Sequence, residues 1–98
     1  MSKASDKVNS QELYRAILSL ESEDECRRFF KDLCTIAELR AMEQRYDVAV
    51  LLDQGLVYSD ILERTGASSA TISRVNKSLN YGEEGYKDVL RHMREQDL

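Results

Sequence analysis

The stretch RTGASSATISRVNKSL, residues 64–79, contains no carboxylate although the chain is acidic overall. The 98-residue sequence has 18 Asp and Glu against 14 Lys and Arg, which gives a net charge of −4. The charged residues of this stretch are all cations, Arg64, Arg74 and Lys77, and short hydroxyl side chains surround them. Gly66 precedes most of these hydroxyls. The stretch therefore combines a turn signal with a locally positive, hydrogen-bonding surface.

The residues around Gly66 predict a helix-turn-helix over about residues 58–79. A short helix is expected from about Tyr58 to Thr65, and a second from about Ser69 to Leu79. Gly66 permits the positive φ that turns the chain sharply between them. The apolar residues of both helices fall at positions that would pack together: Ile61, Leu62, Ala67, Ile72, Val75 and Leu79.

The side chains of the two predicted helices that do not face the apolar packing are suited to binding DNA. The first turn of a recognition helix meets base edges in the major groove, where hydroxyls donate or accept and a methyl group contacts thymine. Cations and free helix amides attract phosphates, whereas a carboxylate would repel them. For the cluster alone, capping hydroxyls and solvated cations remain an alternative. The expected DNA-contacting residues are Arg64, Ser68, Ser69, Ala70, Thr71, Ser73, Arg74 and Lys77.

The rest of the chain predicts only helices, because it has no proline and spaces its apolar residues by three and four. Capping-box patterns at 9–12, 22–25 and 35–38 predict three helix starts. The third helix is expected to be central and buried through VAVLL at 48–52, and to end at Gly55. A last helix follows NYGEEG at 80–85. We expect a disordered tail over residues 1–8 and a single helical domain over 9–98.

Other classes of protein find little support. No signal peptide or membrane span is apparent, so a soluble, cytoplasmic protein is expected. Cys26 and Cys34 match neither a zinc spacing nor a redox pair, and reduced, buried thiols are expected. His92 stands among charged residues with no nucleophile in view, so the protein is not expected to be an enzyme. No metal site is expected, because Glu23, Asp24 and Glu25 form an acidic first helical turn.

From Thr35 to Leu79 the chain resembles the Trp repressor family, in particular its YerC/YecD-like branch. The matching segments are TIAELRAMEQR at 35–45, LLDQG at 51–55 and TGASSATISRVNKSL at 65–79. The resemblance implies a six-helix all-α fold whose first helices interlock with those of a second copy. It also implies a sequence-specific transcriptional regulator, with repression as the first expectation, whose partners are double-stranded DNA and a second copy of the chain.

In Trp repressors a small ligand lies between the long central helix and the recognition helix. The matching positions here are Thr35, Arg45, Arg74 and Ser78. The family's glycine after the recognition-helix arginine is Val75, and a β-branched side chain there would fill the space that an indole needs. No cofactor is therefore expected, tryptophan least of all, although a smaller corepressor stays open. Helix capping by Thr35 and plain surface charge at Arg45 are the alternative interpretation.

The rival to DNA binding is an all-α protein interaction module that docks through the same helix-turn-helix. The acidic balance of the chain and its few cations favour this alternative slightly. Binding of the purified protein to heparin or duplex DNA, with a steep dependence on salt, would distinguish the two.

Overall fold

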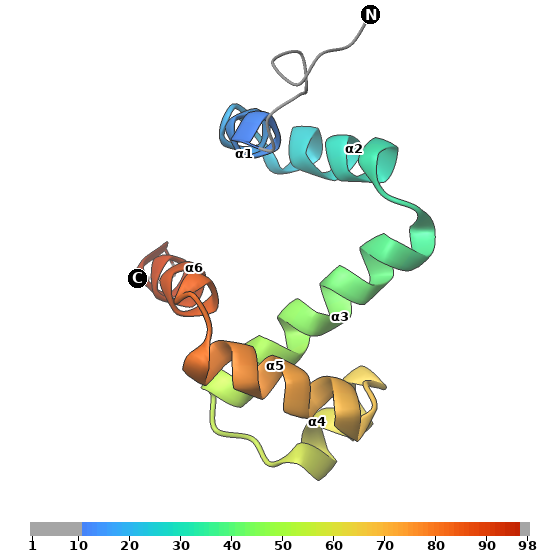
Figure 1. The fold of residues 1–98 in the computed structure, drawn as a ribbon, viewed down its shortest axis with the longest axis vertical. Coiled ribbons are helices and arrows are strands. Elements are labelled where there is room, and N and C mark those ends of the chain that lie inside the picture. Colours follow the sequence, from blue (N-terminus) through green and yellow to red (C-terminus); the bar gives the residue numbers. More distant parts are fainter. Residues whose placement is uncertain (1–10, 97–98) are drawn as a thin grey trace, which may run out of the picture. The chain divides into compact units, whose positions relative to one another are not determined.

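The computed structural model describes residues 11–96, which form six α-helices (Figure 1). Their bounds are α1 Gln11–Leu18, α2 Glu23–Leu33, α3 Ile36–Asp53, α4 Tyr58–Thr65, α5 Ser69–Tyr81 and α6 Gly85–Gln96. The predicted all-α class is confirmed, and no strand occurs within these residues. The chain forms two compact units that meet between Leu39 and Arg40. The expected tail, residues 1–8, lies outside the described residues, and a single domain over 9–98 stays a prediction.

In the first unit, α1 and α2 are amphipathic helices without a fully buried residue. The hydroxyl of Ser22 caps α2 by accepting from the Glu25 N–H at 3.0 Å. Apolar side chains nevertheless stand in the open, and Leu18 is 85% exposed. Cys26 and Cys34 form no disulfide within the described residues. Both are half-buried, whereas fully buried thiols were predicted.

Helix α3 begins and ends with the predicted signals. At its end Gly55 has φ +88°, the left-handed conformation that favours glycine. The Leu56 N–H donates to the Leu51 carbonyl at 3.1 Å, and the Gly55 N–H donates to the Leu52 carbonyl at 3.0 Å. This pair of hydrogen bonds is a Schellman motif, which satisfies carbonyls that the helix itself leaves free. Of VAVLL, only Val48 and Ala49 are fully buried, so the segment is less enclosed than predicted.

The core of the second unit joins α3, α4 and α5. Its buried residues are Val48, Ala49, Ile61, Ala67, Ile72 and Val75, with Leu51, Leu52, Leu56 and Tyr86 packed against them. Burial of each large aliphatic side chain contributes roughly 1.5–3 kcal/mol. The predicted packing is confirmed with one exception, since Leu62 is 46% exposed. Successive helical residues point about 100° apart, so Leu62 cannot share the inward direction of Ile61.

Over residues 11–96, none of the helices combines the length and apolar character that crossing a membrane would require.

Candidate nucleic-acid interface

A three-residue turn, 66–68, joins α4 to α5, which lie side by side (Figure 1). Gly66 has φ +72°, and its N–H donates to the Leu62 carbonyl at 2.9 Å, which closes α4. The Thr65 hydroxyl donates to the Ile61 carbonyl at 2.7 Å and accepts from the Ala67 N–H at 3.1 Å. Ala67 is buried in the core. The turn is therefore fixed by packing and by hydrogen bonds on both sides of Gly66.

Ser68 is the N-cap of α5. Its hydroxyl accepts from the Thr71 N–H at 3.1 Å and also lies 3.1 Å from the Thr71 hydroxyl, to which it donates. The capping interpretation thus holds for Ser68, whose oxygen is engaged within the helix start. Ser69 and Ala70 are exposed, whereas Thr71 is half-buried.

One face of α5 is polar and exposed, and the opposite face is apolar and buried. Ile72, Val75 and Leu79 form the buried side. At about 100° per residue, the expected contact residues Ser69, Ala70, Ser73, Arg74 and Lys77 share an arc that points the other way, and all five are exposed. No carboxylate occurs in α5. We call these five residues the acid-free face of α5.

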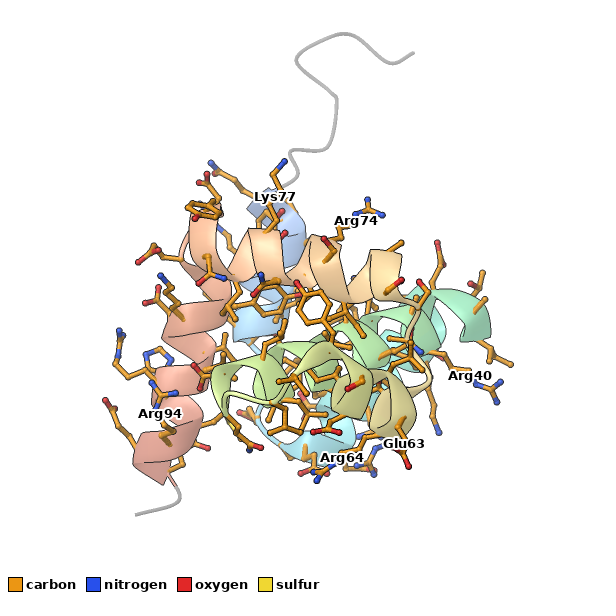
Figure 2. All side chains as sticks on the ribbon, turned by 90° about the horizontal axis from the view of Figure 1, so that it is seen from below. Arg40, Glu63, Arg64, Arg74, Lys77 and Arg94 are labelled. Carbon is orange, nitrogen blue, oxygen red and sulfur yellow. The ribbon has the colours of Figure 1, made fainter. Side chains whose placement is uncertain are left out.

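The three cations of the opening stretch do not lie together. Figure 2 shows Arg74 and Lys77 projecting from the same side of α5, whereas Arg64 lies beside Glu63 at the far side of α4. Within residues 11–96, neither Arg74 nor Lys77 forms an ion pair with a carboxylate. Two unpaired cations are thus available at the acid-free face, and Arg64 stands apart from them.

A cavity of about 310 Å³ adjoins the recognition helix. Its lining residues are Arg45, Arg74, Val75, Ser78 and Tyr86. Four of the five residues expected in a ligand pocket are therefore brought together. Two guanidinium groups and two hydroxyls give the cavity a chemistry that suits an anion. Tyr86, on α6, was not among the residues expected to line a pocket.

Thr35, the fifth expected pocket residue, does not line this cavity. Its hydroxyl accepts from the Glu38 N–H at 3.1 Å, and its own N–H donates to the Glu38 carboxylate at 2.8 Å. These reciprocal bonds form a complete capping box at the start of α3. The backbone hydrogen bond from Thr35 lowers the pKa of Glu38, because it favours the charged carboxylate.

The chain is similar to known proteins along most of its length. The family described as Trp repressor protein matches residues 9–94. The chain belongs to the Trp repressor family.

Relatives of this Trp repressor family member include one curated protein and two solved structures. The uncharacterised protein YerC of Bacillus subtilis (strain 168) is 47% identical over 93 residues, which cover 92% of this chain and 89% of YerC. A TrpR-like protein from Eubacterium eligens is 52% identical, with a TM-score of 0.82 over 85% of this chain and 86% of its own. A candidate Trp repressor from Staphylococcus aureus is 46% identical, with a TM-score of 0.83 over 86% and 84%. The six-helix Trp repressor-like fold is thereby confirmed.

In this family member, residues 11–96 hold no group of three or more His, Cys, Asp or Glu side chains that could bind a metal ion.

Proposed function

We propose that the protein is a homodimeric transcriptional regulator that reads the major groove through α4 and α5, with repression as its mode. The observation that carries the proposal is the acid-free face of α5, held on a buried apolar face by a fixed turn. Hydroxyls and a methyl group at the helix start suit base edges. Arg74 and Lys77 lie further along the same exposed face and suit phosphates, which supply most of the affinity.

The apolar surface of the first unit supports the dimer. Four apolar side chains on α1 and α2 stay substantially exposed within one chain: Leu13, Tyr14, Leu18 and Leu33. Several large apolar side chains exposed on two neighbouring helices are typical of an interaction site in a folded protein. A second copy that interlocks its own first helices with these would cover it. A symmetric dimer would also present two α5 helices to two half-sites of a DNA duplex.

Selection of bound sequences from random duplex DNA tests the function. We expect a motif with two-fold symmetry, and an affinity for it that falls steeply as salt is raised. Recovery of unrelated sequences, together with salt-insensitive binding, would contradict the proposal.

A protein docking module is the second candidate. One observation favours it: Val57, Tyr58 and Leu62 are apolar residues of α4 and its N-cap, and all three are exposed. If α4 docks on a protein, then charged substitutions at Tyr58 and Leu62 should abolish that complex. If α5 reads DNA, these substitutions should leave the selected duplex bound.

A further inference from the structure

The turn between α4 and α5 is attached to the central helix by one side chain. The amide nitrogen Nε2 of Gln44, on α3, donates to the main-chain carbonyl of Thr65 at 3.2 Å. The two residues are 21 positions apart, and both are half-buried. The bond therefore joins separate helices and is partly shielded from water.

The Thr65 carbonyl is an atom for which α4 has no partner. It belongs to the last turn of the helix, where carbonyls receive no intrahelical hydrogen bond. The Gly66 N–H is already committed to the Leu62 carbonyl, and the Thr65 hydroxyl to Ile61 and Ala67. Gln44 thus supplies a donor from outside the helix, at the residue that leads into the turn.

We propose that Gln44 is a positioning residue for DNA reading, which holds the 66–68 turn at a fixed place on α3 and so sets the direction of α5. The inference rests on the proposed function. Gln44 does not touch DNA in this account. Its effect passes through Thr65 to Gly66, and from there to the first turn of α5.

Readout of bases should respond to Gln44 more strongly than attraction to phosphates. Hydrogen bonds to base edges weaken steeply when donor and acceptor are misaligned, so they require a correctly directed helix. Attraction between cations and phosphates varies gradually with distance and tolerates small rotations. A loosened turn should therefore lower sequence preference while leaving general affinity for DNA intact.

Two substitutions remove the donor with little change of shape: Gln44→Met and Gln44→Glu. The matched control is Gln54→Met, which makes the same change at an exposed residue just beyond the end of α3. Circular dichroism and thermal unfolding identify the temperature range in which each variant is folded. All further measurements are made within that range.

The first measurement is amide hydrogen exchange of Gly66 and Ala67 without DNA. We expect exchange to become about tenfold faster in both Gln44 variants, since an unpaired half-buried carbonyl favours local opening. The Gln54→Met control should match the wild type. Unchanged exchange in the Gln44 variants would overturn the proposal whatever the protein binds.

The second measurement is the ratio of affinities for the selected duplex and for a scrambled duplex of equal length. We expect this ratio to fall about tenfold in the Gln44→Met variant, with affinity for the scrambled duplex unchanged within about twofold. If Gln44 only stabilised the fold, this ratio of affinities, measured on folded protein, would be the same in the variant and the wild type. That result would overturn the proposal. If the wild-type protein shows no preference for the selected duplex, the proposed function itself is contradicted, and the role of Gln44 in DNA reading is contradicted with it.

Discussion

Side chains on the acid-free face of α5 divide into those that suit phosphates and those that suit bases. Lys77, on that face, lies two turns beyond the start of α5 and extends into solvent. Thr71 lies beside the face, half-buried in the first turn. A lysine acts as a point charge without a preferred base, but a hydroxyl makes directional hydrogen bonds as a donor and as an acceptor. The Ser68 hydroxyl donates to the Thr71 oxygen and so restricts the directions in which the Thr71 hydroxyl can bond a base.

Substitution of these two residues should separate affinity from specificity. We expect Lys77→Ala to weaken binding to all duplexes alike and to reduce the slope of log affinity against log salt by about one. Thr71→Ala should relax preference at one base pair by about 1–3 kcal/mol. Filter binding or fluorescence anisotropy over a salt series measures both. The control is Lys87→Ala, which removes the same charge from α6, and an effect there equal to that of Lys77→Ala would contradict the assignment.

Val75 leads to a prediction about tryptophan. It is 2% exposed and lies in the core, yet it also borders the cavity beside Arg45 and Arg74. A ligand tightens DNA binding only if it prefers the DNA-competent form, and a filled indole site offers no such preference. We expect millimolar tryptophan to leave DNA affinity unchanged. Isothermal calorimetry and binding to the selected duplex test this.

The companion variant is Val75→Gly, which enlarges the cavity at a cost of about 1 kcal/mol in helix propensity, plus the lost packing of a buried valine. If it gains a response to tryptophan, Val75 is the filler. A tenfold gain in the affinity of the wild type on adding tryptophan would instead show that the matching polar positions outweigh Val75.

Among the helix connections, Gly66 is the one whose backbone conformation the sequence dictates most directly. An alanine Cβ at Gly66 would meet no atom within 4 Å, so the cost of substitution lies in φ +72° alone. We expect Gly66→Ala to destabilise the fold by about 1–2 kcal/mol. Gly85→Ala is the control, since its Cβ also meets open space but its φ is not positive. Urea unfolding should show a neutral or slightly stabilising effect there, and equal destabilisation would contradict the reasoning.

The capping box at the start of α3 predicts an acid-sensitive helix terminus. The pKa of Glu38 is lowered in the folded chain, chiefly by the Thr35 N–H. A lowered folded pKa stabilises the native state fully above the ordinary glutamate pKa, and the stabilisation is lost as pH falls through the lowered value. A side-chain carboxyl titration by NMR should show the lowered midpoint. In the Glu38→Gln variant, the free energy of unfolding should no longer show the pH dependence that titration of Glu38 causes. An unchanged dependence of this free energy on pH would contradict the assignment.

Local signals predicted the elements of this fold well. Gly55, Gly66 and the capping residues Ser22 and Thr35 each act through hydrogen bonds within a few positions, so the sequence around them contains nearly all the information. Leu62 was misplaced because its apolar character fitted a buried helix, although its direction next to Ile61 did not.

Some contacts between residues far apart in the sequence could not be predicted. Tyr86 reaches the cavity, and Gln44 reaches Thr65, only because separate helices pack together. Nothing in the residues next to Gln44 indicates a carbonyl 21 positions away. Arg64 and Arg74 share one acid-free stretch, yet they project from different helices on different sides. The number of cations in a stretch of sequence is therefore larger than the number that lie together on one surface of the folded chain.

At the scale of the whole molecule, the exposed apolar side chains of α1 and α2 predict that folding and association are coupled. An interlocked dimer should lose structure and partner together on dilution, so its apparent unfolding temperature should rise with protein concentration. Analytical ultracentrifugation combined with circular dichroism measures both. A folded monomer at micromolar concentration would contradict the dimer. Leu18→Glu should shift the protein toward unfolded monomer, because it places a charge on the surface to be buried.

The acid-free face of α5 also shapes how such a protein would search a genome. The rest of the chain holds all 18 carboxylates and the other 12 Lys and Arg, so it carries the excess of negative charge. A duplex that approaches this remainder would on average be repelled within roughly one Debye length, about 8 Å in physiological salt. Productive encounters with DNA would therefore be those in which α5 faces the duplex. If the protein binds DNA as proposed, Arg74 and Lys77 are the two cations of that face that would hold phosphates of any sequence, and each stop on unrelated DNA would be brief. The protein would move between sites often, and little of it would be held on the vast excess of sequence that it does not regulate.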